Sequence, residues 1–133
     1  MNYLIIWNGT SSPSNGTDLN FDVASGGTRS NTGNWAKIQL AFTPSLTATQ
    51  TENQTSIIAG RMGTQSSMIT LQIGNPFLAS ETNLFSNAYQ KASGNYDMNI
   101  TNGNHFLDTS YDGFYVAPSS GTFTGTIKIY GYK

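Results

Sequence analysis

Residues that could carry out acid–base catalysis are few in this chain. His105 is the single histidine, and it lies in Asn104-His105-Phe106-Leu107 directly after a turn-like Asn-Gly-Asn. No serine stands in a nucleophile-elbow context that such a base would serve. Seven carboxylates are scattered along the chain, and nothing marks two of them as the facing pair that a glycosidase needs. We therefore expect His105 to be a loop or strand-edge residue, assign no catalytic residue and no cofactor, and expect the chain not to be an enzyme.

One segment has part of the pattern of a calcium-binding loop. Asp108, Ser110 and Asp112 place oxygen atoms at alternate positions, and Gly113 is sixth in the run. The pattern then fails, because position twelve is Ser119 where a bidentate glutamate is required. An Asp-rich turn before a strand is the simpler interpretation. A calcium-dependent lectin, or a small carbohydrate-active domain, stays an alternative.

Aromatic side chains are the remaining candidates for binding. Flat rings stack on sugars while neighbouring Asn, Gln and Asp bond the hydroxyls, which makes Trp35, Tyr111 and Tyr115 candidates for a glycan site. The Asn-rich segments 8–20 and 94–104 would form its rims. Aromatic residues are also typical of subunit interfaces and of strand-rich cores, and the candidates for an interface are Tyr3, Trp7, Tyr130 and Tyr132.

The elements that must position these residues read as short strands separated by Gly, Asn, Ser and Pro clusters. We expect eight strands, over residues 2–7, 19–23, 35–42, 56–61, 68–73, 95–100, 111–117 and 122–130. Such a series predicts a β-sandwich or a barrel. One segment differs: the larger residues between Ser80 and Lys91 recur at i, i+1, i+4 and i+5, which fits one short helix or an irregular loop.

The closing strand is the clearest of these elements. From Thr122 to Tyr130 polar and apolar residues alternate with a period of two, which only a strand satisfies. The pattern places Phe123, Ile127 and Ile129 on one side, where we expect them to face the core. Strand 2–7, at the other end of the chain, could add to a neighbour's sheet if it is exposed.

Composition bounds the class of protein. At 133 residues the chain is long enough for a single domain, 1–133. Its formal net charge is −1 and its few basic residues are scattered, so nucleic acid is not an expected partner. No apolar stretch approaches the length of a membrane span. The lack of cysteine excludes disulfides and fits synthesis in a reducing cytoplasm.

The chain's ending resembles that of a known group of proteins. Tyr111-Asp-Gly-Phe-Tyr-Val, followed by Pro118-Ser-Ser-Gly-Thr-Phe-Thr-Gly-Thr-Ile-Lys-Ile-Tyr-Gly-Tyr, is similar to the closing hairpin of many tailed-bacteriophage virion proteins. In these proteins an aromatic strand, a Ser/Gly turn and a Gly-Thr-x-x-Tyr-Gly-like ending complete a β-sandwich head. The resemblance covers about the last 25 residues and implies a place on the virion exterior, after synthesis in the host cytoplasm.

We therefore predict an all-β antiparallel sandwich of jelly-roll type, acting as a virion structural protein. Because no shaft precedes the strand-like run that begins at Asn2, we expect a small separate subunit, most simply a capsid decoration (cement) protein that stabilises the shell. Its partners would be the major capsid protein or fibre subunits, and copies of itself, with a trimer as one arrangement. The alternative is the tip of a tail fibre or head fibre that binds a host receptor or surface glycan.

Overall fold

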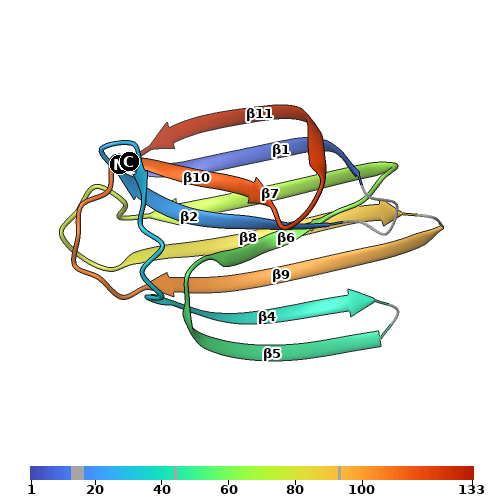
Figure 1. Ribbon diagram of the computed structural model, residues 1–133, viewed down its shortest axis with the longest axis horizontal. Helices are drawn as coiled ribbons and strands as arrows, with labels where there is room; N and C mark the ends of the chain where they lie inside the picture. Colours follow the sequence, from blue (N-terminus) through green and yellow to red (C-terminus); the bar gives the residue numbers. More distant parts are fainter. Residues whose placement is uncertain (13–16, 44, 93) are drawn as a thin grey trace.

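The computed structural model is all-β (Figure 1). It describes residues 1–12, 17–43, 45–92 and 94–133, and within these ranges it contains eleven strands. The strands are β1 (Asn2–Ser12), β2 (Thr17–Ser25), β3 (Thr28–Arg29), β4 (Trp35–Thr43), β5 (Ser45–Gln54), β6 (Ile57–Met62), β7 (Ser66–Gly74), β8 (Thr82–Ala92), β9 (Asn95–His105), β10 (Gly113–Pro118) and β11 (Thr122–Tyr132). The described residues contain no helix long and apolar enough to cross a lipid bilayer.

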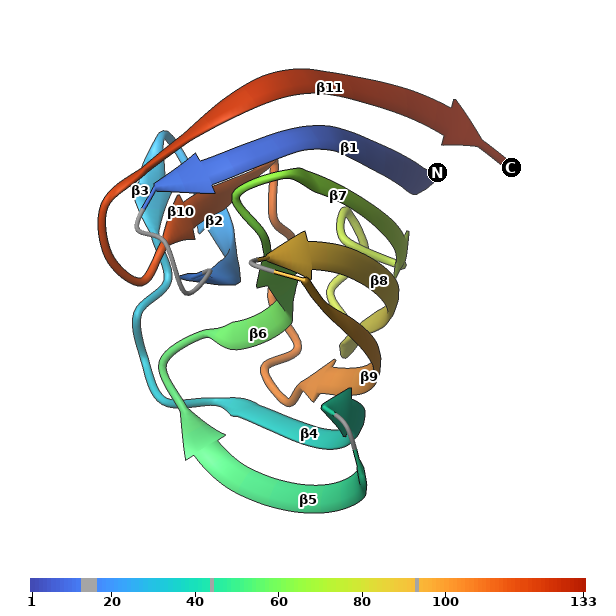
Figure 2. The ribbon, with the colours of Figure 1, turned by 90° about the vertical axis from the view of Figure 1, so that its right-hand side faces the viewer.

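The strands form two antiparallel sheets packed face to face, which confirms the predicted β-sandwich (Figure 2). The large sheet has seven strands in the order β11-β1-β7-β8-β9-β4-β5. In the small sheet β10, β3 and β6 all pair with β2. The finer jelly-roll assignment stays a prediction.

The core lies between the two sheets and follows from alternation along the strands. In β7 the side chains facing the small sheet are buried, while those between them reach the opposite face. The buried residues with the largest side chains include Trp7, Trp35, Phe21, Ile5, Leu19, Ile57, Ile69 and Leu71. Burying one such side chain stabilises the fold by about 1.5–3 kcal/mol.

A glycine allows β6 to lie close to the large sheet. A Cβ atom at Gly60 would overlap with Cβ of Ala88, which faces it from β8. The Ser86 hydroxyl, two residues earlier in β8, donates a hydrogen bond to the carbonyl of Ala59. Small residues therefore let β6 and β8 approach so closely that a side chain of one sheet bonds the backbone of the other.

The segment predicted as a short helix or an irregular loop is mostly strand β8, so that prediction was wrong. Thr82, Leu84, Ser86, Ala88 and Gln90 are buried, and Asn83, Phe85 and Asn87 between them are exposed. This period of two places Leu84 and Phe85, which a helix would have kept on one side, on opposite faces of the sheet. Pairing with β7 on one side and β9 on the other fixes the extended conformation.

Two other differences concern strands β5 and β1 of the large sheet. Strand β5 was not predicted, because its polar residues show no apolar alternation, and pairing with β4 alone makes it a strand. Strand β1 is not an exposed edge as proposed, because it pairs with β7 on one side and β11 on the other. The segments expected as Asn-rich rims lie largely in β1, β2 and β9, and residues 13–16 and 93 fall outside the described residues.

The closing strand β11 is confirmed, but the burial expected for it is only partly correct. Phe123 packs edge-on against Trp7, with 5.9 Å between the ring centroids. Ile127 and Ile129 share the inner face with Trp7 and Ile5, their cross-strand partners, yet remain 43% and 51% exposed. They remain exposed because β11 is the edge strand and the small sheet does not extend over it (Figure 2).

Candidate functional site

The three residues proposed to stack on sugars do not form a surface site. Trp35 and Tyr111 are buried, at 1% and 3% exposure, so neither ring face is open to a ligand. Only Tyr115 is exposed, at 42%, and the guanidinium of Arg29 lies 5.0 Å from its ring centroid. The glycan site proposed around these residues was therefore wrong, because the two larger candidates serve the core.

Trp35 belongs to a buried polar cluster centred on Asp22. The Asp22 carboxylate accepts hydrogen bonds from Trp35 Nε1 at 2.8 Å, from Arg29 Nε at 2.9 Å and from the backbone N–H of Asn31 at 3.0 Å. These donors come from β4, β3 and the loop after β3. A buried carboxylate is tolerated when such bonds satisfy it. The cluster therefore anchors the 26–34 segment to the sandwich.

His105 lies beside this cluster and is 1% exposed. Its Nδ1 is 3.3 Å from the Tyr111 hydroxyl and its Nε2 is 3.4 Å from the Ser30 hydroxyl. Burial lowers the pKa of His105, and the negative charge of Asp22 opposes this shift. His105 is the last residue of β9, and its enclosure between Trp35 and Tyr111 favours a structural role.

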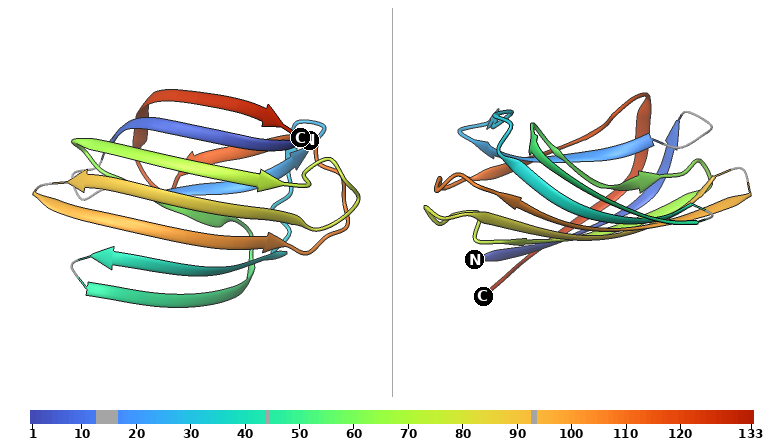
Figure 3. Two further views of the ribbon diagram at one scale, coloured as in Figure 1. Left: turned by 180° about the vertical axis from the view of Figure 1, so that it is seen from behind. Right: turned by 90° about the horizontal axis from the view of Figure 1, so that it is seen from below.

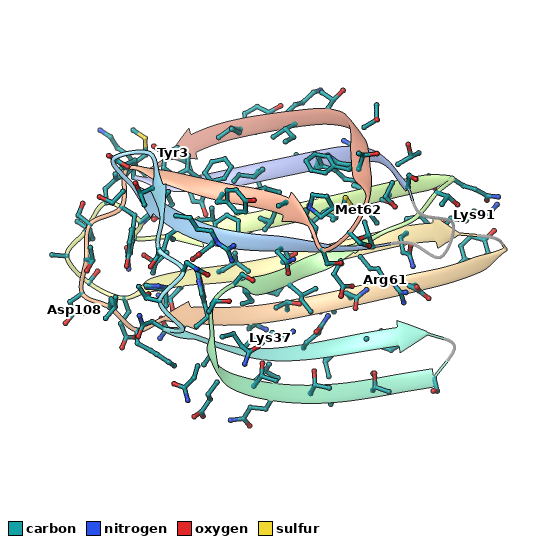
Figure 4. The ribbon with its side chains drawn as sticks, in the orientation of Figure 1. Tyr3, Lys37, Arg61, Met62, Lys91 and Asp108 are labelled. Atoms are coloured by element: carbon teal, nitrogen blue, oxygen red, sulfur yellow. The ribbon has the colours of Figure 1, made fainter. Side chains whose placement is uncertain are left out.

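The proposed calcium residues are used in bonds between loops. The Ser110 hydroxyl donates to the carbonyl of Phe77 at 2.9 Å, and both Asp112 carboxylate oxygens accept from the Gly26 N–H at 3.0 Å. Asp108 lies at one end of the molecule (Figure 4). No group of three or more acidic or histidine side chains that could hold a metal ion is found among the described residues.

The four proposed interface residues divide between interior and surface. Trp7 is 1% exposed and belongs to the core, so its assignment to an interface was wrong. Tyr3 is half-buried and packs edge-on against Phe77 at 5.6 Å between ring centroids. Tyr130 and Tyr132 are 48% and 43% exposed on β11. Their cross-strand partners Leu4 and Asn2 lie on the face of β1 opposite the core.

That opposite face of the large sheet, called the outer face below, is open. Viewed from behind, no described element crosses it (Figure 3). An uncovered sheet face normally carries polar side chains. Among the described residues this face carries nine exposed large hydrophobic ones, namely Ile38, Phe42, Leu46, Met68, Phe85, Tyr96, Met98, Tyr130 and Tyr132.

Strand register aligns five of the apolar outer-face residues in one row. Leu46 of β5 faces Phe42 of β4, which faces Met98 of β9. Met98 faces Tyr89 of β8, and Tyr89 faces Met68 of β7. Directly opposed side chains in a sheet are close neighbours, so these residues form a continuous apolar ladder across five strands. No charged residue belongs to the ladder.

The opposite end of the outer face is polar and hollowed. A groove of about 520 Å³ crosses β5, β4, β9, β8, β7, β1 and β11. Its polar lining consists of Lys37 and of the amides Asn2, Gln50, Gln72, Asn83, Asn102 and Asn104, and its apolar lining includes Ile38, Phe85 and Tyr132. Gln50, Gln72, Asn83 and Asn102 form no side-chain hydrogen bond with the described part of the chain. Their donors and acceptors are therefore free for a ligand.

A second polar region lies on the inner face, and its side chains form hydrogen bonds with one another. Lys37, on β4 next to β9 (Figure 4), donates to Gln39 Oε1 at 2.9 Å, and Gln39 donates to Asn99 Oδ1 at 3.1 Å. Burial lowers the pKa of Lys37, opposed by the charge of Asp18. Among the described residues Lys37 forms no ion pair, and the one other titratable group on the wall of the groove that it borders is Tyr132. The outer face is the better candidate site.

Comparison with protein-family models, with curated proteins and with solved structures found no match for the chain. The chemistry of the outer face therefore carries the functional conclusion.

Neither the apolar ladder nor the amide-lined groove was predicted from the sequence. Ile38 and Phe42 were visible as alternating residues in their strand, but alternation alone does not say which face is open. Met98, Phe85, Asn83 and Asn102 gave no signal, because their neighbours in space come from other strands.

Proposed function

We propose that this protein is a non-enzymatic structural subunit that attaches to a larger protein assembly through the apolar ladder of its outer face. The ladder is the observation that carries the proposal. Monomeric soluble proteins rarely expose contiguous apolar patches above a few hundred Å², and larger ones mark interaction sites. Met and aromatic residues, which form four of its five positions, are enriched at protein interfaces.

The resemblance of the closing segment supports a particular setting, the exterior of a tailed-phage virion. In that setting the outer face rests on the major capsid protein or on fibre subunits, and the protein acts as a capsid decoration protein. Burial of the ladder against neighbouring capsomers stabilises the shell, because apolar area removed from water contributes about 25 cal/mol per Å². The chain's low net charge suits a contact that excludes water.

The test uses phage shells prepared without this subunit. Wild-type protein is expected to co-sediment with the shells and to raise their disruption temperature. Replacing Phe42 and Met98 by Ser removes two adjacent ladder residues and is expected to weaken shell binding at least about tenfold, since interface hot spots contribute 2 kcal/mol or more. Folding of the variant is checked by circular dichroism.

Leu78→Ser is the matched control, because Leu78 is 53% exposed but lies in the loop between β7 and β8. It is expected to bind shells like the wild type. Failure of the wild-type protein to co-sediment contradicts the capsid proposal. Equal losses in the control and in the ladder variant contradict the assignment to the ladder.

The amide-lined groove favours a second candidate function, a fibre-tip domain that binds a neutral host glycan. Amide side chains offer both donors and acceptors to sugar hydroxyls, and Phe85 and Tyr132 are 39% and 43% exposed, which leaves ring surface for stacking. The carboxylate of Glu81, which accepts from Asn104 Nδ2 at 2.6 Å, disfavours an acidic sugar beside it.

A glycan array distinguishes this function from shell binding. Asn102→Ala and Phe85→Ala are expected to abolish glycan signals while leaving the ladder intact. Asn87→Ala is the control, because Asn87 is exposed on the same face but does not line the groove. Absence of any signal for the wild type, or equal loss in Asn87→Ala, removes the glycan function.

A further inference from the structure

Strand β11 is a free edge of the large sheet that lacks the usual protection against pairing with another strand. Among the described residues it pairs only with β1, so its other edge presents unpaired backbone N–H and C=O groups. Its register with β1 runs over all eleven residues, without a bulge. It contains no proline, and Lys128 is its one charged residue. Proteins usually protect such an edge with charges, prolines, bulges or short strands.

The other edge of the same sheet provides an internal comparison. Strand β5 has a register shift opposite Trp35 and Lys37, and Asn53 near its end has a positive φ of 56°. Leu46 is its one large apolar residue, and the rest are mostly Ser, Thr, Gln and Asn. The β5 edge therefore carries the protective features that the β11 edge lacks.

The inner side of β11 is also incompletely covered. Ile127 and Ile129 face the interior but remain 43% and 51% exposed. Ile129 borders a cavity of about 400 Å³ whose other walls include Tyr3, Phe21, Ile73, Phe77 and Phe114. Apolar surface of the sandwich thus remains open along the strand whose backbone is unpaired.

We propose that β11 is the interface between two copies of this chain, which pair antiparallel about a two-fold axis and join their large sheets edge to edge. Two antiparallel copies of β11 present complementary side chains to each other when the two-fold axis passes through Ile127. Thr122, Thr124 and Thr126 of one copy then face Tyr132, Tyr130 and Lys128 of the second copy. On the inner face, Phe123 and Gly125 face Gly131 and Ile129 of the second copy, and Ile127 faces its own equivalent.

This register satisfies the known preferences of cross-strand pairs. All eleven residues are paired, every large side chain other than Ile127 faces a smaller one, and no two like charges stand directly opposite. A register centred on Lys128 would place two ammonium groups opposite each other. A β11–β11 interface uses the edge of the sheet, so it is independent of the outer-face docking proposed above.

The oligomeric state of the full chain tests the proposal. Sedimentation velocity over a range of micromolar concentrations is expected to show a species of twice the 14.3 kDa monomer mass. Ile127→Lys places two lysines opposite each other and is expected to raise the dimer dissociation constant about tenfold or more. Leu46→Lys makes the same kind of change on the β5 edge, at a residue that is 60% exposed against 43% for Ile127, and is expected to leave the dimer unchanged.

The register is tested separately by cysteine cross-linking. This is straightforward because the chain has no native cysteine that would interfere. Ile127→Cys places two sulfurs opposite each other across the axis and is expected to form an intermolecular disulfide under mild oxidation. Ile129→Cys is expected not to, since its partner is Gly125 of the second copy and the two sulfurs lie several residues apart. A monomer at all concentrations, a trimer, a dimer insensitive to Ile127→Lys, or cross-linking through position 129 instead of 127 would each overturn the proposal.

Discussion

At the scale of single residues, the buried carboxylate of Asp22 controls how one long segment is attached. It has no exposed surface and accepts bonds from Trp35, Arg29 and Asn31. Asp22→Asn removes the negative charge that pairs with Arg29. It also places the N–H groups of an amide where the carboxylate now accepts hydrogen bonds from Trp35, Arg29 and Asn31. We expect the free energy of unfolding to fall by about 2–4 kcal/mol in urea titrations.

Asp108→Asn serves as the control for this prediction. Asp108 is exposed in the 106–112 loop, so its substitution is expected to change the free energy of unfolding by no more than about 0.5 kcal/mol. Similar losses for the two variants would show that Asp22 has no special role in stability.

His105 makes stability depend on pH in a defined direction. Its pKa in the folded protein lies below the ordinary value of about 6.5, because burial disfavours the charged ring. Below pH 6.5 the unfolded chain therefore binds more protons than the folded one, and stability decreases as the pH falls toward the folded pKa. We expect this slope to be shallower in His105→Gln, measured by urea titration from pH 7 to pH 5. A His105 pKa at or above 6.5 by NMR titration would contradict the prediction.

Little at this scale could be predicted from sequence. The chain shows Trp35, Tyr111 and Tyr115 as equivalent aromatic residues in strand-like runs. Their environments differ because Trp35 donates a hydrogen bond to the buried Asp22 and the Tyr111 hydroxyl contacts His105, whereas Tyr115 is 42% exposed on β10. Such contacts join residues far apart in the chain, and no local pattern encodes them.

At the scale of elements, the close approach of β1 and β11 depends on a pair of facing glycines. Gly9 and Gly125 are cross-strand partners, and a Cβ atom on Gly9 would overlap with the carbonyl oxygen of Thr124 and lie 2.7 Å from a ring carbon of Trp7. Gly9→Ala is therefore expected to lower the free energy of unfolding by about 1–3 kcal/mol, as overpacking does.

Gly74→Ala is the matched control for Gly9→Ala. Gly74 also lies in a strand, but the nearest atom to a Cβ there is 3.9 Å away. This variant is expected to be neutral or more stable by up to about 1 kcal/mol, because alanine restricts the unfolded chain. Thermal unfolding of both variants decides the matter, and equal stability would show that the β1–β11 contact can relax.

The elements themselves were largely predictable where alternation is strong. Ile69, Leu71 and Ile73 identified β7, and Phe123, Ile127 and Ile129 identified β11. Strand β8 was not predicted, because the adjacent Leu84 and Phe85 imitate a helical pattern although they face opposite sides of the sheet. Strand β5 was not predicted either, because its polar residues follow no period and it is extended only through its pairing with β4.

At the scale of the whole molecule, the register of strand pairing determines which side chains are neighbours on the outer face. The ladder draws one residue from each of five strands, so its existence requires every pairing between β5 and β7 to be correct. Sequence predicted the sandwich, but it could not predict this surface or the groove beside it. The residues of the ladder are nonetheless outside the core, which separates their effect on binding from their effect on stability.

This separation gives a prediction for the isolated protein. Phe42→Ser/Met98→Ser is expected to reduce binding of the apolar dye ANS while changing the free energy of unfolding by no more than about 1 kcal/mol, since both side chains are more than two-fifths exposed. Leu78→Ser, in the loop, is expected to leave dye binding almost unchanged. Unchanged dye fluorescence in the ladder variant would show that the ladder does not act as one apolar surface.

The pairing of β1 with β11 has a consequence for how the chain folds as it is made. Asn2 lies opposite Tyr132, so β1 leaves the ribosome well before its neighbour β11, and the strands between them in the sequence are made in the meantime. Contacts of such high sequence separation form late and slowly. Until then the nascent chain exposes the edge of β1, and a neighbouring nascent chain on the same messenger could supply the missing strand.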